Sequence, residues 1–280
     1  MNPFARLELL LGAERMSRLQ SATVMVVGLG GVGSSCAEAL ARGGIGSLIL
    51  IDGDSIEPSN INRQALAFIS TIGKPKTHTM AAMVADINPA CTTHTAQVFL
   101  TRENLAQIFD SLPRPDYVID CIDTVAAKIE IAQWCAHHSI HLISSMGAAN
   151  KLDPSYLRFA KIQKTQNCPL SKSVRRICIE RRIRGLEVLY SAEEPAQIFP
   201  PASDPSPKRR TKAQTLGSIS YMPPIMGQML AGKVLRRVAR IEEWPLPPRI
   251  GHAAKESSGA PSVTPHNSHT ATQLPADDTP

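Results

Sequence analysis

The feature that most constrains the fold is a glycine-rich turn between a predicted strand and a predicted helix. Residues 23–27 are apolar and mostly β-branched, and residues 34–42 are rich in helix-forming Ala, Glu and Leu. Between them stands the run Gly28-Leu29-Gly30-Gly31-Val32-Gly33. In this context Gly28 allows a tight turn, Gly30 lets the backbone approach a phosphate, and Gly33 lets the helix pack closely on the strand. The sequence therefore predicts a nucleotide site at the start of this helix.

Strand and helix patterns alternate through about residue 150, in the order typical of βαβ units. Further strands are predicted near residues 47–51, 93–98, 117–120 and 141–144, and further helices near 76–87 and 126–138. The first two strands are apolar on both faces, which suits a parallel sheet covered by helices on both sides. We therefore expect an α/β fold with a doubly wound, mostly parallel, Rossmann-like sheet.

Composition places the chain among globular proteins. With 280 residues, of which 43% are hydrophobic and 19% charged, it is unlike collagen, a coiled coil or a wholly disordered chain. Its apolar runs are far shorter than the roughly 18–20 residues of a membrane span, and charges stand where a signal peptide would be apolar. We expect a cytoplasmic protein without a membrane span.

The second half of the chain differs from the first in charge and ends in a polar segment. We expect one folded domain over residues 1–248, with a nucleotide-binding core at about 20–150 and a basic part at about 151–245. Residues 249–280 are rich in Ser, Thr, Pro, Ala and His, and lack the apolar side chains needed to offset ordering entropy. This C-terminal extension is predicted to be a disordered tail.

Polar and cationic residues follow the second strand, where a nucleotide would lie. Asp52 ends that strand, 24 residues after Gly28, in the position of an acid that binds ribose hydroxyls. We expect Asn60, Arg63 and Lys76 to return to the carboxyl edge of the sheet beside the phosphates. Three such donors fit a triphosphate that is being opened better than a pyrophosphate that is merely held.

These residues belong to a pattern that resembles a known family. In order and spacing, the pattern is similar to the ubiquitin-activating-type adenylyltransferases of the ThiF/MoeB superfamily over about residues 4–150. The stretches that carry the resemblance are Gly28-x-Gly30-Gly31-x-Gly33, Asp52-x-Asp54, Asn60-x-Asn62-Arg63-Gln64, Gly73-x-x-Lys76, Ile87-Asn88-Pro89 and Asp120-Cys121-Ile122-Asp123. Ser144 to Ala148, Leu152-Asp153-Pro154 and Tyr190-Ser191-x-Glu193 extend it, to about residue 235, toward the bacterial tRNA threonylcarbamoyladenosine dehydratase branch.

The resemblance implies a role for each matched residue. Asp52 would bind the ribose of ATP, and Asn60, Arg63 and Lys76 would hold its phosphates. Asp123 would coordinate Mg²⁺, a hard cation that prefers carboxylate and phosphate oxygens. ATP and Mg²⁺ are therefore the expected cofactors.

A further implied role belongs to the N-terminus. Phe4-Ala5-Arg6 resembles the part of the family pattern in which an arginine reaches into the ATP site of the partner subunit. Arg6 would then be a catalytic residue supplied in trans, and the protein would be a homodimer. The preceding position is often arginine in the family and is Pro3 in this chain, so one donor is missing.

The reaction implied by the resemblance begins with attack of a carboxylate on the α-phosphate of ATP. In the dehydratase branch this carboxylate belongs to the threonine of threonylcarbamoyladenosine in tRNA. A nucleophile within the same modification then closes a ring with overall loss of water, so no enzyme cysteine is needed. The resemblance leaves a sulfur-transfer protein open as a further partner.

Positive charge is concentrated in the second half of the chain. Residues 161–184 hold eight basic side chains against the single acidic side chain of Glu180, within a chain of formal charge +6. A dense patch of one sign raises the affinity for a polyanion such as tRNA. The residues that we expect to contact tRNA are Lys172, Arg175, Arg176, Arg181 and Arg182.

Two other functions compete with this interpretation. One is activation of the C-terminal carboxylate of a ubiquitin-like sulfur-carrier protein, but many such enzymes have two C-x-x-C pairs and this chain has none. The other is an NAD-dependent oxidoreductase, which would leave Asn60, Arg63, Lys76 and Asp123 without a role. Within the dehydratase branch, Cys168 departs from the usual pattern because aspartate commonly precedes Pro-Leu there.

Overall fold

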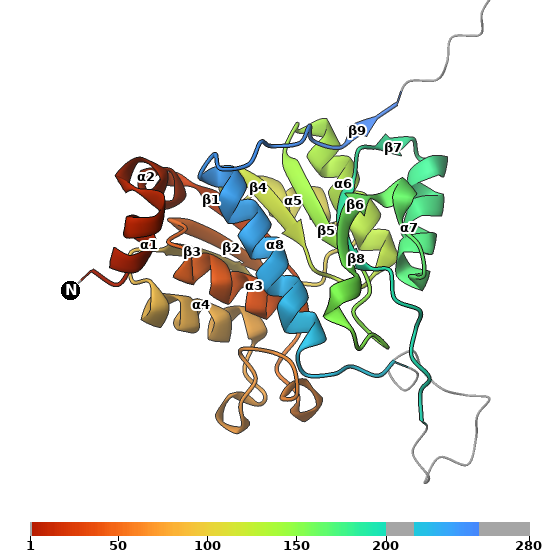
Figure 1. The fold of residues 1–280 in the computed structure, drawn as a ribbon, viewed down its shortest axis with the longest axis horizontal. Coiled ribbons are helices and arrows are strands. Elements are labelled where there is room, and N and C mark those ends of the chain that lie inside the picture. Colours follow the sequence, from red (N-terminus) through yellow and green to blue (C-terminus); the bar gives the residue numbers. More distant parts are fainter. Residues whose placement is uncertain (1, 200–215, 252–280) are drawn as a thin grey trace, which may run out of the picture.

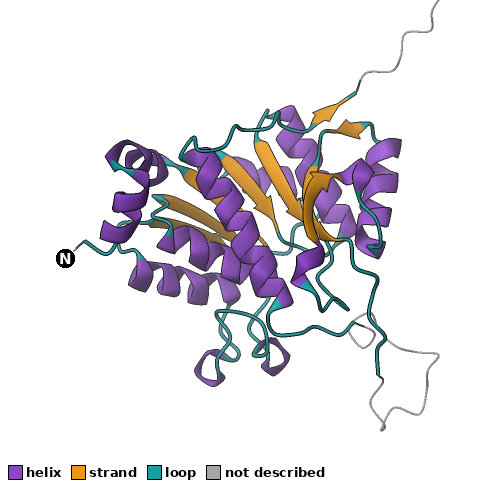
Figure 2. Ribbon diagram, in the orientation of Figure 1, coloured by secondary structure: helices purple, strands orange, loops and turns teal. Residues whose placement is uncertain are grey.

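The computed structural model describes residues 2–199 and 216–251, which form a layered α/β fold (Figures 1 and 2). The strands are β1 (Thr23–Val27), β2 (Ser47–Ile51), β3 (Thr92–Ala96), β4 (Tyr117–Asp120), β5 (His141–Ser145), β6 (Leu157–Lys161), β7 (Ile183–Arg184), β8 (Glu187–Ser191) and β9 (Arg249–Ile250). The α-helices are α1 (Ala5–Leu11), α2 (Ala13–Ser21), α3 (Gly31–Arg42), α4 (Lys76–Ile87), α5 (Leu105–Asp110), α6 (Val125–His137), α7 (Pro169–Glu180) and α8 (Met222–Val238). Short 3₁₀ turns lie at Pro58–Asn60, Ile69–Thr71, Pro154–Tyr156 and Ile162–Lys164.

Seven strands form one sheet in the order β3-β2-β1-β4-β5-β8-β6. Every neighbouring pair is parallel except β8 and β6, which are antiparallel. The strand order reverses at β1, which pairs with β2 on one side and β4 on the other. The predicted doubly wound, mostly parallel sheet is therefore confirmed, and its reversal creates a crevice at the carboxyl ends of β1 and β4.

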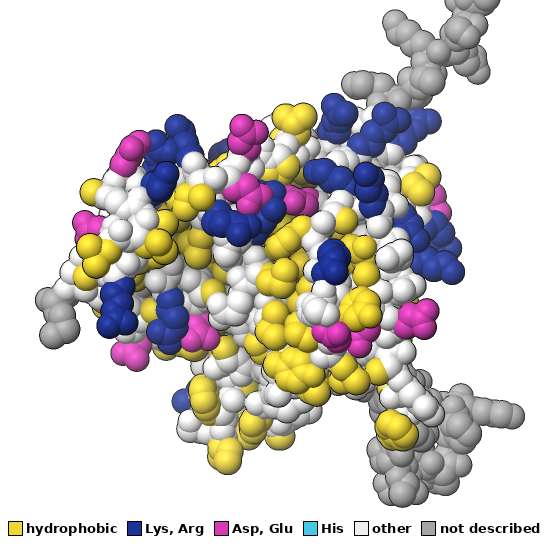
Figure 3. Space-filling view, in the orientation of Figure 1, with side chains coloured by type: hydrophobic (Ala, Val, Ile, Leu, Met, Phe, Trp, Pro, Cys, Tyr) yellow, Lys and Arg dark blue, Asp and Glu magenta, His cyan; other side chains and the backbone are white. Residues whose placement is uncertain are grey.

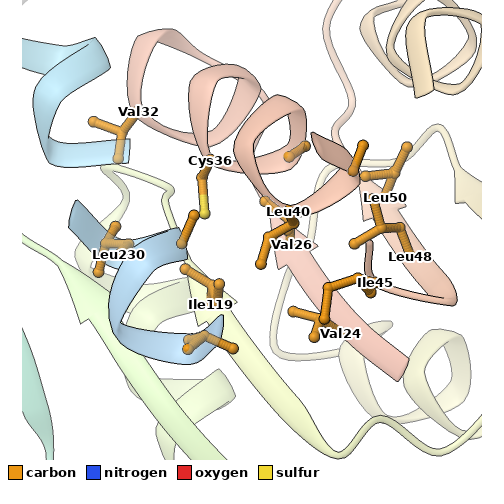
Figure 4. Packing of buried hydrophobic residues seen from close by; sticks show 14 of the residues in the cluster. Val24, Val26, Val32, Cys36, Leu40, Ile45, Leu48, Leu50, Ile119 and Leu230 are labelled. Atoms are coloured by element: carbon orange, nitrogen blue, oxygen red, sulfur yellow. The ribbon is translucent and has the colours of Figure 1, made fainter. Parts of the chain in front are cut away.

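Alternating side chains of the central strands enter two separate hydrophobic cores. Val24 and Val26 pack with residues of α3 and α8 on one face of the sheet, whereas Met25 and Val27 pack with α5 and α6 on the other. Figure 4 shows the first core, in which Val26 of β1 lies beside Leu40 of α3, and Cys36 of α3 lies beside α8. Because both faces are covered, β1 and β2 have no polar face, as their apolar sequences predict.

The second half of the chain completes the same sheet. β8 adds to β5, and α8 crosses the front of the sheet beside α3 (Figure 1). The guanidinium of Arg237 on α8 donates to both carboxylate oxygens of Glu187 at 2.8 and 2.9 Å and to the hydroxyl of Tyr117 at 2.7 Å. These charge-assisted bonds connect α8 to two strands of the sheet.

The end of the described chain differs slightly from the prediction. Arg249 and Ile250 form β9 and pair antiparallel with β7, although both residues belong to the segment that we expected to be a tail. Residues 252–280, the rest of that segment, lie outside the described residues. Among the residues that are described, no helix is both long and apolar enough to cross a membrane.

The approach of α3 to α8 depends on a glycine and can be tested with a matched pair of substitutions. A Cβ at Gly227 would lie 2.2 Å from the carbonyl oxygen of Val32, whereas a Cβ at Gly232, on the same helix, would meet nothing within 4 Å. We expect Gly227→Ala to lower the free energy of unfolding by about 1–3 kcal/mol because the helices must separate. Gly232→Ala should raise it by about 0.5–1 kcal/mol. Urea unfolding followed by circular dichroism measures both, and equal effects would contradict this packing.

Candidate active site

A cleft of about 1180 Å³ opens at the carboxyl ends of β1, β2, β4 and β5. It lies at the reversal of strand order, where open α/β sheets bind their ligands. Its wall contains eight of the predicted site residues, namely Gly28, Gly30, Gly31, Asp52, Asn60, Arg63, Lys76 and Asp123. The structure thus brings together residues that are separated by as many as 95 positions in the chain, from Gly28 to Asp123.

The glycine loop has the geometry that its sequence predicts. Gly28 has φ of 86°, in the left-handed region that favours glycine. A Cβ on Gly33 would lie 1.7 Å from the carbonyl oxygen of Gly28, so Gly33 packs beneath the loop instead of facing the cleft. A Cβ on Gly30 would meet nothing within 4 Å, and α3 begins without a side-chain cap. The first N–H groups of α3 are therefore available to an anion.

Asp52 connects the end of β2 to this loop. One carboxylate oxygen accepts a hydrogen bond of 2.5 Å from the backbone N–H of Leu29, and the other accepts one of 2.7 Å from Asp54. Burial raises the pKa of Asp52 above its ordinary value, and the ammonium group of Lys76, 4.0 Å away, opposes this effect. Asp52 thus positions the loop itself, in addition to any contact with a ligand.

The three expected phosphate donors already have internal partners. Lys76, at the first position of α4, donates to the carboxylate of Asp54 at 2.7 Å. Arg63 donates to the backbone oxygen of Ser59 at 2.9 Å, and the side-chain N–H of Asn60 donates to the hydroxyl of Ser59 at 3.3 Å. A phosphate would therefore share these donors with the protein.

Asp123 occupies the loop between β4 and α6, in the wall of the cleft. Within residues 2–199 and 216–251 there is no cluster of three or more His, Cys, Asp or Glu side chains that could hold a metal ion. Mg²⁺ needs no such cluster, because it is commonly bound by one or two carboxylates together with phosphate oxygens and water. The donor set at Asp123 fits an ion of this kind.

A buried ion pair beside the cleft was not predicted. The ammonium group of Lys128 donates to the carboxylate of Asp120 at 3.0 Å, to the hydroxyl of Ser144 at 3.2 Å and to the backbone oxygen of Ser145 at 2.7 Å. Lys128 and Asp120 are 1% and 0% exposed. The sequence did contain a signal for this pair: Asp120 ends a strand, and Lys128 lies among apolar residues of the helix that follows.

The far end of the cleft is built from the loop after β5 and the start of α7, with Gly147, Lys151 and Cys168 in its wall. Lys151 is 2% exposed and donates to the backbone oxygens of Asn167, at 3.0 Å, and Glu193. Burial lowers the pKa of Lys151 below its ordinary value. The sulfur of Cys168 accepts a 3.4 Å hydrogen bond from the N–H of Ser171, so this cysteine caps α7 in place of the usual aspartate.

The five expected tRNA contacts lie on α7 and the turn after it, but they are not equivalent. Arg175 donates to Thr165 at 2.7 and 2.8 Å, and Arg181 pairs with Glu130 at 2.7 Å. The exposed members of the set are Lys172, Arg176, Arg181 and Arg182. Figure 3 shows Lys and Arg side chains gathered over α7, β7 and β9.

Arg6 lies outside the cleft wall of its own chain. It is exposed on α1, which packs near Gly44 in the turn that precedes β2, and thus at the opposite end of the strands from the cleft. An Arg6 that serves a cleft would have to serve that of another copy, so its role stays a prediction.

Comparison with known proteins gives the family. Residues 4–272 match the ThiF family. The tRNA threonylcarbamoyladenosine dehydratase of Bacillus subtilis is 40% identical over 84% of this chain and 94% of its own length. The molybdopterin-synthase adenylyltransferase of Haemophilus influenzae is 34% identical over 49% of this chain and 54% of its own length.

Solved structures agree with the sequence relatives. Crystal structures of the tRNA N6-threonylcarbamoyladenosine dehydratase TcdA of Escherichia coli, in complex with AMP and with ATP, superpose with TM-scores of 0.75. They are 29% and 28% identical and cover 85% of this chain and 94% of theirs. The chain therefore belongs to the ThiF family, and within it the chain is similar to the tRNA threonylcarbamoyladenosine dehydratases.

Proposed function

We propose that this protein is an ATP-dependent tRNA threonylcarbamoyladenosine dehydratase that adenylates the threonine carboxylate of its substrate. The observation that carries the proposal is the extent of the likeness. The dehydratase of B. subtilis matches 84% of this chain, and the fold of its E. coli counterpart covers a similar share. A tRNA substrate also agrees with the expected cytoplasmic location.

In the proposed complex, ATP lies along the carboxyl edge of the sheet. Its phosphates bind the N–H groups at the start of α3, with Arg63 and Lys76 supplying positive charge and Asn60 a neutral donor. The free lone pairs of Asp52 accept hydrogen bonds from the ribose. Because Lys76 is paired with Asp54 at 2.7 Å, a bound phosphate takes over part of that ion pair.

The proposed reaction has two steps. A carboxylate oxygen attacks the α-phosphorus, the bond to the bridging oxygen breaks, and pyrophosphate leaves. A nitrogen of the modified nucleoside then attacks the activated carbonyl carbon and loses its proton, while AMP leaves with the former carboxylate oxygen. Arg63 and Lys76 stabilise the charge that develops on the phosphates, and Mg²⁺ held by Asp123 would neutralise more of it.

Activation of a sulfur-carrier protein is the second candidate function. The specific observation that favours it is the molybdopterin-synthase adenylyltransferase relative, which matches about half of this chain. If sulfur were passed through a thiol of this chain, that thiol would have to be accessible, yet five of the six cysteines are buried and Cys121 is half-buried. The same burial weighs against a sulfur-transfer partner that reacts with an enzyme thiol.

The first test of the proposal is substrate-dependent consumption of ATP. Purified protein with ATP and Mg²⁺ should form AMP and pyrophosphate only with tRNA that bears threonylcarbamoyladenosine. The modified nucleoside should lose about 18 Da, the mass of the water whose oxygen leaves in AMP. Asp123→Asn should lower kcat roughly 10²- to 10³-fold, because charge on the phosphates is less well stabilised. Turnover with unmodified tRNA, or only with a carrier protein that ends in Gly-Gly, would contradict the proposal.

Contact of α7 with tRNA predicts a change in salt dependence. Lys172, Arg176 and Arg182 are exposed, so their replacement by glutamine should weaken tRNA binding while ATP affinity is unchanged. The slope of log affinity against log salt should fall by about 0.7–0.9 for each phosphate contact removed. Filter binding at several salt concentrations measures it, with Arg15→Gln, on exposed α2, as the control. A slope equal to that of the wild-type protein would show that α7 does not contact tRNA.

The proposed homodimer predicts complementation between inactive subunits. Arg6→Ala and Asp123→Ala should each be inactive if Arg6 acts in the cleft of the partner. Equal mixing should restore about a quarter of the activity, because half of the dimers are mixed and each has one intact site. Subunit exchange is checked by mass spectrometry of the mixture. Absence of recovery despite exchange would show that Arg6 does not act across an interface.

A further inference from the structure

Besides Lys76, two lysines of the described chain are almost completely buried beside the cleft, and their surroundings differ. Lys128 is 1% exposed and has three hydrogen-bond acceptors, one of which is the carboxylate of Asp120. Lys151 is 2% exposed, and its acceptors are the neutral backbone oxygens of Asn167 and Glu193. An ammonium group has three N–H donors, so Lys151 has one donor more than it has partners.

Lys151 also forms no direct ion pair, although the carboxylates of Glu193 and Glu194 are near enough to oppose the effect of burial on its pKa. Within the described part of the chain, no carboxylate lies within 4.0 Å of its nitrogen. The nearby carboxylate of Glu193 accepts instead from the backbone N–H groups of Leu152 and Asp153, at 3.0 to 3.1 Å. Burial of an ammonium group without an ion pair costs free energy. Binding of an anionic ligand at this lysine would offset that cost.

The surrounding loops hold this lysine in place. Asn150, the residue before this lysine, accepts hydrogen bonds from two other segments. The N–H of Ala196 donates to its backbone oxygen at 2.8 Å, and the N–H of Gly217 donates to its side-chain oxygen at 2.7 Å. Asn167 donates to the backbone oxygen of Ala192 at 2.9 Å. The amine of Lys151 is thus fixed by three segments before any ligand binds, which lowers the entropic cost of binding.

The position of Lys151 in the cleft indicates which part of the substrate it would contact. The glycine loop and Asp52 occupy one end of the cleft, Asp123 lies in the loop after β4, and Lys151 follows β5, the next strand of the sheet. If the nucleotide occupies the glycine-loop end, Lys151 faces the acceptor. The anionic group of the acceptor that has to approach the α-phosphate is its carboxylate.

We propose that Lys151 binds the carboxylate of the acceptor and positions it for attack on the α-phosphate. This inference rests on the proposed function and adds a residue for which the sequence pattern predicted no role. The third N–H of Lys151 donates to the carboxylate, which supplies the direct ion pair that the described part of the protein does not. Loss of a hydrogen bond between charged groups should weaken binding of the acceptor roughly 10- to 150-fold.

A thermodynamic cycle between the enzyme and its substrate tests the contact. Dissociation constants are measured for the wild-type protein and for Lys151→Gln. Each protein is tested with tRNA that bears threonylcarbamoyladenosine and with the same tRNA lacking the modification. Gln keeps two N–H donors for the backbone oxygens of Asn167 and Glu193 but removes the charge. Lys151→Met, which removes the donors as well, is the second variant.

Lys172→Gln is the matched control, since Lys172 is exposed on α7 and should contact phosphates that both tRNAs share. It should weaken binding of the two tRNAs equally. Lys151→Gln should weaken binding of the modified tRNA alone, so that the preference for it disappears. Thermal unfolding and ATP affinity establish that each variant is folded. Should Lys151→Met unfold, Lys151→Gln decides the outcome, and Lys151→Arg, which keeps the charge, should retain part of the preference.

The other outcomes separate this inference from the proposed function. If Lys151→Gln keeps the preference for modified tRNA, or weakens both tRNAs equally, Lys151 does not bind the carboxylate, although the dehydratase function stands. If the wild-type protein turns over modified tRNA but binds both tRNAs with equal affinity, Lys151 likewise does not bind the carboxylate. If the wild-type protein consumes no ATP with modified tRNA, both the proposed function and the proposed role of Lys151 are wrong.

Discussion

The cleft depends on the hydrogen bond of 2.5 Å between the carboxylate of Asp52 and the backbone N–H of Leu29. This bond connects the end of β2 to the glycine loop, which in turn closes on itself because Gly33 has no Cβ to strike the oxygen of Gly28. Asp52 also lies 4.0 Å from Lys76, so the start of α4 is connected to the same point. Three elements that carry the proposed nucleotide contacts are therefore positioned by one carboxylate.

The two ends of the cleft differ in how their charges are balanced. At the nucleotide end, Lys76 is paired with Asp54 and lies near Asp52, so the charge of this lysine is balanced before a ligand arrives. At the other end, Lys151 has only backbone oxygens as partners. A polyphosphate brings its own cation and competes for paired donors, whereas a single carboxylate needs one unpaired donor at a fixed place.

Much of the nucleotide half could be predicted from sequence because its signals are local. The strand at 23–27, the glycines after it and Asp52 lie within 30 residues, and βαβ topology brings them to one edge of the sheet. The acceptor end has no such local signal. Lys151 is held by the backbone of Glu193, 42 residues away, and a backbone carbonyl leaves no mark in the sequence. Likewise, Arg175 and Arg181 appear as surface charges in the sequence, although both bond to other parts of the fold.

The state of the cysteines agrees with a reaction in which the substrate supplies its own nucleophile. Burial raises the pKa of Cys91 and of Cys178 to about 11, so both remain thiols at neutral pH. Cys168, in the cleft wall, uses its sulfur to accept a hydrogen bond at the start of α7. Activation of a carboxylate by AMP makes its carbon reactive enough for a nitrogen of the same nucleoside, so the protein has to supply only positive charge and position. Arg63, Lys76 and Lys151, all in the wall of one cleft, are the side chains that can supply both.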